Sequence, residues 1–209
     1  MTTAKTGQTA DLEAAVDCLR GGGVIALPTD TLYALACDAR DAAAVRRVYR
    51  IKGREDGKPL PLFVSDLDVA GRYAVLNDTA RRFAARFWPG ALTIVCKKQP
   101  DFESEALAGG ETVALRVPDH PLALEVLRGL GGPITGTSAN RSGGPDPDTA
   151  EEVRRQLGDE VDLVVDAGAC PGGVSSTIVD CTGEAVRILR HGAIPEDEVL
   201  AVLKEASPR

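Results

Sequence analysis

Apolar residues recur along this chain at two spacings, which separate predicted helices from predicted strands. In residues 11–20 they return every three or four positions, as on one face of a helix, and three glycines follow. Residues 24–27 form a short uninterrupted apolar run, which predicts a buried strand leading into the polar turn 28–31. Because ligands of open α/β sheets bind where strands end, this turn is a candidate part of a binding site.

The remaining predicted elements alternate along the chain. Asp41 can cap a helix that ends before Gly53, and either Asn77 or Asp78 opens a helix through residue 87. Further helices are predicted at 121–128, 149–157 and from 195 onward. Predicted strands cover 59–64, 91–96, 112–117, 133–136, 161–166, 176–180 and 185–189. This alternation gives an α/β class, and the closely spaced late strands imply a mixed sheet.

Composition narrows the choice of domain number and compartment. A chain of 209 residues with 44% apolar content can bury one substantial core, so we expect a single domain over residues 8–205. The first eight residues lack a signal-peptide pattern, and the run 24–27 is too short to cross a bilayer. Five cysteines without a CxxC argue against disulfides and zinc. We expect a cytoplasmic protein with no membrane partner and no metal site.

A basic cluster stands out against the formal net charge of −7. Six cations fall within residues 46–58, which indicates a local phosphate or carboxylate site rather than general attraction to polyanions. Lys52 and Arg54 flank a glycine after a predicted helix, so both side chains can converge on one anion, with Lys58 beside them. A solvated charged loop is the alternative. The other three cations are expected on the outer helix face: Arg46, Arg47 and Arg50.

A second polar stretch, residues 137–140, follows the strand predicted at 133–136. Ser138 and Asn140 lie two apart, so in an extended segment both can face a phosphate, ribose or base edge. An ordinary turn with local hydrogen bonds is the alternative. The chain has no GxxxxGK[ST], GxSxG or GxGxxG motif. Its cations, hydroxyls and amides suit catalysis by electrostatic stabilisation of phosphoryl charge, and the two clusters together indicate a nucleotide triphosphate.

Eight short motifs follow one another in a specific order over residues 21–194. They are Leu27–Tyr33 (LPTDTLY), Lys52–Arg54 (KGR), Lys58–Leu60 (KPL), Trp88–Thr93 (WPGALT), Val113–Pro121 (VALRVPDHP), Thr137–Asn140 (TSAN), Ser175–Thr177 (SST) and Leu189–Arg190 (LR). In this order they resemble the YrdC-type L-threonylcarbamoyladenylate synthases, in their short single-domain form. The resemblance implies the YrdC-like fold, a twisted mixed β-sheet flanked by helices around a large concave cationic cavity.

The resemblance also implies a reaction and its partners. L-threonine, bicarbonate and ATP would give threonylcarbamoyl-AMP and pyrophosphate, with Mg²⁺ arriving on ATP and not on a dedicated protein site. The product would pass to a threonylcarbamoyl-transferase complex, which modifies position 37 of tRNAs that read ANN codons. A weak direct contact with tRNA is a further expectation.

Individual residues take roles from the same resemblance. Lys52 and Arg54 would be the catalytic cations. The ATP site would be formed by Arg54, Lys58, Thr112, Gly136, Ser138, Asn140, Asp146 and Arg190. The threonine site would be formed by Thr31, Phe63, Arg116 and Ser176. Phe63 stands where many relatives have His, and it cannot donate a hydrogen bond to threonine.

Two other hypotheses account for parts of the sequence. A carbamoyl-adenylate-forming domain of the hydrogenase-maturation type shares the fold and a Lys-Pro segment, but acylphosphatase and zinc-finger regions are absent from this sequence. An RNA-binding module would use the concave basic surface. The acidic total and the 4% aromatic content weigh against that module, because readers of single-stranded RNA stack bases on aromatic rings.

Overall fold

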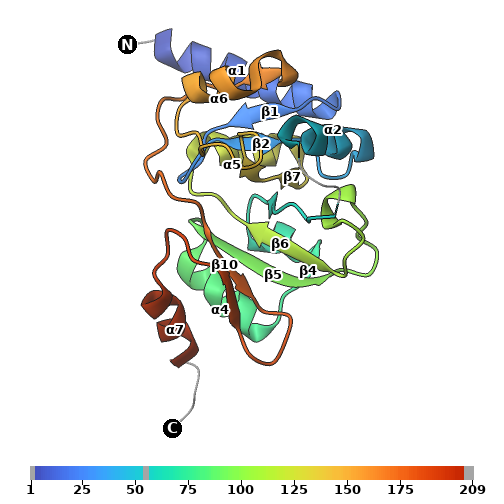
Figure 1. Cartoon of the computed structure of the whole chain (residues 1–209), viewed down its shortest axis with the longest axis vertical. Coiled ribbons are helices and arrows are strands. Elements are labelled where there is room, and N and C mark those ends of the chain that lie inside the picture. The colour runs from blue at the N-terminus through green and yellow to red at the C-terminus, as the bar shows by residue number, and fades with distance from the viewer. Residues whose placement is uncertain (1–2, 54–56, 205–209) are drawn as a thin grey trace.

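Two mixed β-sheets organise the chain (Figure 1). The structure is a computed structural model that describes residues 3–53 and 57–204, with side chains from residue 11 onward. The smaller sheet has the order β8-β2-β1-β9 and consists of β1 (Ile25–Leu27), β2 (Ala34–Ala36), β8 (Thr137–Ser138) and β9 (Leu163–Val164). Its strand β1 is antiparallel to β2 and parallel to β9.

The larger sheet has the order β11-β10-β5-β6-β3-β7, and β4 also pairs with β5. Its strands are β3 (Leu62–Phe63), β4 (Ala74–Val75), β5 (Leu92–Lys98), β6 (Thr112–Arg116), β7 (Ile134–Thr135), β10 (Thr177–Asp180) and β11 (Arg187–Arg190). It also mixes directions, because β5 is parallel to β10 and antiparallel to β6. The predicted mixed α/β fold is confirmed, with its strands divided between two sheets.

Residues 134–138 join the two sheets. Strand β7 pairs with β3 of the larger sheet, and after one intervening residue β8 pairs with β2 of the smaller sheet. That residue is Gly136, whose N–H donates to the carbonyl of Pro61 at 2.7 Å. A Cβ at Gly136 would lie 2.4 Å from the ring of Phe63. Glycine is therefore required where the backbone changes sheets, because any side chain would collide with that ring.

Helices cover both ends of the structure. They are α1 (Thr3–Arg20), α2 (Ala42–Lys52), α3 (Leu67–Ala70), α4 (Asp78–Phe87), α5 (Pro121–Leu130), α6 (Ala150–Leu157) and α7 (Glu196–Lys204). Figure 1 shows α1 and α6 beside the smaller sheet, and α4 and α7 at the opposite end next to the larger one. Asp41 and Asn77 cap α2 and α4 by accepting backbone N–H groups, as predicted, whereas α1 begins earlier than the predicted Asp11.

Two buried apolar clusters fix these elements. One lies between α1, α5 and the smaller sheet and includes Leu19, Ile25 and Leu127. The other includes the inward face of α2, formed by Val45, Val48 and Ile51, together with the core of the larger sheet. All five cysteines are free thiols. Within the described residues, no helix combines the length and apolar content that crossing a membrane requires.

Candidate active site

A cavity of about 680 Å³ is lined by residues of both sheets, and most of the predicted site residues lie on its walls. Those that line it are Thr31, Lys52, Lys58, Phe63, Arg116, Gly136, Ser138, Asn140, Asp146, Ser176 and Arg190. The sequence therefore identified residues that the fold brings together from the turn after β1, from α2, from the crossing segment 134–138 and from the larger sheet. This convergence is what a ligand site requires.

Two predicted residues are not among the described residues that line this cavity. Arg54 lies outside the described residues, so its position stays a prediction. Thr112 begins β6 opposite Lys97 and is not among the described residues that line the cavity. Arg116 ends the same strand four residues later, which places the two about 13 Å apart at the usual rise of a strand. The expectation that Thr112 contacts a ligand here has no support in its position.

Lys52 connects the basic cluster with the polar stretch 137–140. It is the last residue of α2, and its side chain is buried. Its Nζ donates to Ser138 O at 2.6 Å, to Asn140 O at 3.0 Å and to Asn140 Oδ1 at 3.0 Å. Asn140 in turn donates to Gly144 O at 2.8 Å and to Asp146 Oδ1 at 3.2 Å. An ammonium has three N–H donors, so Lys52 fixes this wall while adding its charge to the cavity.

The rest of the basic cluster divides as predicted. Arg46 pairs with Glu105 at 2.9 Å and Arg47 with Asp162 at 2.5 Å, both on the face of α2 away from the core. Lys58 is exposed and lines the cavity. The apolar stripe of α2 explains this division, because burying Val45 and Val48 turns the two arginines toward solvent.

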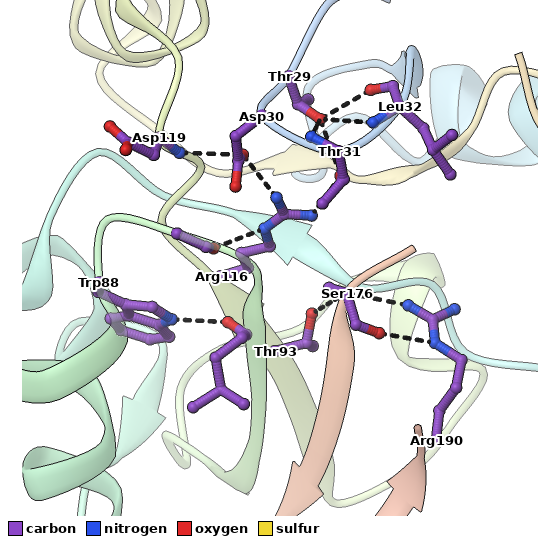
Figure 2. A network of polar contacts seen from close by, with 12 residues as sticks. Thr29, Asp30, Thr31, Leu32, Trp88, Thr93, Arg116, Asp119, Ser176 and Arg190 are labelled. Carbon is purple, nitrogen blue, oxygen red and sulfur yellow. Dashed lines mark hydrogen bonds and ion pairs between the residues drawn. The ribbon is translucent and has the colours of Figure 1, made fainter. Parts of the chain in front are cut away.

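Arg116 is a buried cation whose donors are largely assigned (Figure 2). Its Nε donates to Gly90 O at 2.9 Å, its Nη1 to Thr31 Oγ1 at 3.0 Å and its Nη2 to Asp30 Oδ1 at 2.5 Å. The Phe63 ring centroid lies 5.4 Å from its Cζ. Burial lowers the pKa of Arg116, and the charge of Asp30 opposes that effect. Within the described residues two of its five N–H donors remain for an anionic ligand, such as a carboxylate.

Asp30 is a residue of this site that the sequence analysis did not select. Its Oδ1 also accepts the backbone N–H of Asp119 at 3.0 Å, which ties the end of β1 to the segment after β6. The hydroxyl of Thr29 accepts the N–H groups of Thr31 and Leu32 and thereby shapes the turn that presents Asp30 (Figure 2). A carboxylate in a polar turn at a strand end was the available signal. Its partner Arg116 lies 86 residues away, so the pairing could not be predicted from the spacing of residues in the sequence.

Arg190 and Ser176 form a second polar contact in the cavity (Figure 2). Arg190 donates from Nε to Ser176 O at 2.9 Å and from Nη2 to Ser176 Oγ at 2.9 Å. Desolvation lowers the pKa of Arg190, while the charge of Asp146 raises it. No carboxylate among the described residues lies within ion-pair distance of this guanidinium, and Arg190 as a whole residue is exposed. Its charge is therefore available to a bound anion.

The described residues form no cluster of side chains that could ligate a metal ion. Across residues 3–53 and 57–204, no group of three or more His, Cys, Asp or Glu side chains is arranged to hold a metal ion. The cavity offers guanidinium, ammonium, hydroxyl and amide groups. Such groups bind and orient anions and stabilise charge that develops on phosphoryl oxygens.

Known proteins match most of this chain. Residues 17–192 match the sequence profile of the Sua5_yciO_yrdC family, which carries the description "Telomere recombination". The chain belongs to the Sua5/YciO/YrdC family. This member is 40% identical over 190 residues to the threonylcarbamoyl-AMP synthase of Bacillus subtilis, covering 88% of this chain and 54% of that protein. It is 39% identical over 190 residues to the putative threonylcarbamoyl-AMP synthase of Mycobacterium tuberculosis strain H37Rv, covering 90% and 87%.

A solved structure agrees with the sequence relatives. This family member superposes on Pyrococcus abyssi Sua5 complexed with L-threonine with a TM-score of 0.89 and 34% sequence identity. The match covers 93% of this chain and 57% of that protein. The chain thus spans about half the length of the Bacillus and Pyrococcus relatives, and most of the length of the Mycobacterium relative.

Proposed function

We propose that this protein is an L-threonylcarbamoyladenylate synthase, which converts L-threonine, bicarbonate and ATP into threonylcarbamoyl-AMP and pyrophosphate. The similarity to relatives named threonylcarbamoyl-AMP synthase supports this, as does the likeness to a Sua5 structure that contains L-threonine. The observation that carries the proposal is one cavity that holds two separate cationic contacts, Arg116 beside Thr31 and Arg190 beside Ser176. Such an arrangement suits one small carboxylate substrate and one polyphosphate substrate.

In this proposal the amino acid occupies the region around Arg116. The two remaining N–H donors of Arg116 bind the threonine carboxylate, a charge-assisted contact worth about 1.5–3 kcal/mol. Thr31 and Ser176 also line the cavity, and each supplies a hydroxyl group to the amino acid. Phe63 adds an apolar surface, with its ring against Arg116 and Gly136. Threonine is therefore held through its carboxylate, and its amine is left to react.

The nucleotide occupies the remainder of the cavity in this proposal. The threonine amine attacks bicarbonate with loss of water, and a carboxylate oxygen of the resulting N-carboxythreonine attacks the α-phosphorus as pyrophosphate leaves. Lys58 and Arg190 contact the triphosphate, and Lys52 contributes charge and holds Ser138 and Asn140. Arg54, two residues after Lys52 in the sequence, adds a further catalytic cation. Mg²⁺ is carried by ATP as part of the substrate.

We further propose the destination of the product. Threonylcarbamoyl-AMP would pass in the cytoplasm to a transferase complex that modifies position 37 of tRNAs, with at most weak contact between this protein and tRNA. The relatives named threonylcarbamoyl-AMP synthase support this place in tRNA modification.

One experiment separates the proposal from its alternatives. The purified protein is mixed with Mg²⁺, ATP, labelled bicarbonate and either threonine, another amino acid or carbamoyl phosphate, and the AMP adducts are identified by mass spectrometry. We expect a labelled adduct and pyrophosphate only with threonine. An adduct that requires carbamoyl phosphate would indicate a carbamoyl-adenylate enzyme. Binding of RNA without any adduct would indicate an RNA-binding module.

A further inference from the structure

We propose that Thr93 is a positioning residue that directs the hydroxyl hydrogen of Ser176 into the cavity and thereby makes Ser176 a hydrogen-bond donor to the amino-acid substrate. This inference rests on the proposed function and deepens it. Thr93 lies on β5, is 1% exposed and is not among the cavity-lining residues. Figure 2 shows Thr93 on one side of Ser176 and Arg190 on the other.

The geometry around the Ser176 hydroxyl restricts its hydrogen bonds. A guanidinium can only donate, so Ser176 Oγ accepts the bond from Arg190 Nη2 at 2.9 Å. The Ser176 oxygen then has one further lone pair and one hydrogen to place. Thr93 Oγ1 lies 2.8 Å from it, and this bond can run in either direction. The direction chosen decides which of the two, lone pair or hydrogen, Ser176 offers to a ligand.

Burial of Thr93 decides that direction. Within the described parts of the chain, Ser176 Oγ is the hydrogen-bond partner of Thr93 Oγ1, with no second partner for this hydroxyl. If Thr93 accepted the bond, its own O–H would be buried without an acceptor, which is costly. If Thr93 donates, every buried donor is satisfied and Ser176 keeps its hydrogen. Since Ser176 lines the cavity, that hydrogen is available to a ligand.

A serine fixed in this way complements an anionic substrate. It accepts from Thr93 and Arg190 and donates outward, so a carboxylate or carbamate oxygen finds a preoriented donor. Strand pairing keeps Thr93 in place, because β5 runs parallel to β10 with Thr93 in register with Ile178. The backbone of Ser176 is held independently by the bond from Arg190 Nε to Ser176 O at 2.9 Å. Losing the Thr93 hydroxyl would therefore free the Ser176 hydrogen without displacing the residue.

The test compares four variants: Thr93→Val, Thr93→Ser, Ser176→Ala and the double variant of Thr93→Val with Ser176→Ala. Pyrophosphate release is measured against threonine and ATP. Thr93→Val keeps the side-chain shape without the hydroxyl, and we expect its KM for threonine to rise about tenfold with an unchanged KM for ATP. Thr93→Ser keeps the hydroxyl and should match the wild type. Adding Thr93→Val to Ser176→Ala should change nothing further, because Thr93 acts through Ser176.

Several outcomes overturn the inference. If the role of Thr93 were purely structural, Thr93→Val would lower the thermal stability and would reduce the activity with threonine and with ATP to the same extent. The same loss would also appear when Thr93→Val is added to Ser176→Ala. Equal kinetics of Thr93→Val and the wild type would also reject it. If Thr93→Val does not fold, Thr93→Ala also removes the hydroxyl, and its additional loss of a methyl group should lower stability without favouring one substrate. Absence of threonine-dependent product from the wild-type protein would instead reject the proposed function, and the inference with it.

Discussion

Arg116 and Arg190 lie in the same cavity and belong to the same sheet, yet their surroundings are opposite. Arg116 is 3% exposed and forms an ion pair with Asp30, whose side chain is 15% exposed. Arg190 is exposed, and its hydrogen bonds run to neutral oxygens of Ser176. The first charge is balanced inside the protein, and the second is left for a ligand.

This difference separates two ways of recognising an anion. A buried guanidinium that is already paired adds little net charge, so it selects a ligand by the fixed direction of its remaining N–H groups. An exposed guanidinium with neutral partners attracts any anion and responds to ionic strength. A small carboxylate needs the first kind of contact, whereas a triphosphate gains from the second. Each substitution below changes one arginine or its surroundings, and a salt titration then compares both contacts in the wild-type protein.

The largest effect is expected from Arg116→Ala. This change leaves the largely buried carboxylate of Asp30 without its ion-pair partner, so the free energy of unfolding should fall by about 3 kcal/mol, measured by urea denaturation. The KM for threonine should rise about a hundredfold, far more than the KM for ATP. Arg46→Ala is the matched control, because Arg46 and Glu105 form an exposed pair whose loss should cost less than about 1 kcal/mol. Equal destabilisation by both variants would contradict the structural difference between the arginines.

Arg190→Ala should act mainly on ATP, with a smaller rise in the KM for threonine because Arg190 also holds Ser176. Its kcat/KM for ATP should drop about fiftyfold, because a cation near the transferring phosphoryl group is lost. Its free energy of unfolding should stay within about 1 kcal/mol of the wild type, since no buried carboxylate loses a partner. Arg187→Ala, in the same strand but not among the described cavity-lining residues, should leave the ATP kinetics unchanged. A loss confined to threonine binding would show that the two arginines have been assigned the wrong ligands.

Salt should distinguish the two contacts without any substitution. Between about 0.05 M and about 0.5 M NaCl, the KM for ATP should rise about threefold through screening of exposed charges. The KM for threonine should stay nearly constant, because Arg116 is buried and its charge is already paired with Asp30. Parallel increases in both constants, measured by pyrophosphate release, would mean that Arg116 also acts through net charge.

The smallest effect is expected from Phe63→Leu. The Phe63 ring lies under the Arg116 guanidinium, and losing this cation–π contact should raise the KM for threonine about threefold. The KM for ATP should not change, because Arg190 has no ring contact with Phe63 among the described residues. Isothermal titration with each substrate gives the same comparison without turnover. An effect on ATP alone would remove Phe63 from the amino-acid region.

Local features of the fold were the most predictable. The ends of α2 follow from Asp41, which caps the first turn, and from Gly53, which has φ 59°. These signals act within a few residues and need no knowledge of the tertiary structure. The division into two sheets was not predictable in this way. Residues 133–136 have the composition of one strand, and only the pairing with two distant partners reveals that the segment changes sheets at Gly136.

The site shows the same limit. Ser138 and Asn140 were selected from their own spacing, and both line the cavity. The segment is not extended throughout, because the chain bends at residues 139–140 and Ser138 donates to Asn140 Oδ1 at 2.8 Å. Asp30 and Thr93 were missed because their importance lies in partners reached through strand pairing and turns. Thr93 had one local signal, since it is the single hydroxyl-bearing side chain in the apolar run 91–96. A polar residue within a buried strand requires a partner, and its partner here is Ser176.

The crossing segment 134–138 makes the two halves of the cavity mechanically dependent. Residues 134–138 pair with strands of both sheets, so a change in this segment would alter both walls of the cavity. A side chain at Gly136 would collide with the ring of Phe63 and displace the segment from its partner strands, rather than remove a single contact. Binding of both substrates would weaken together.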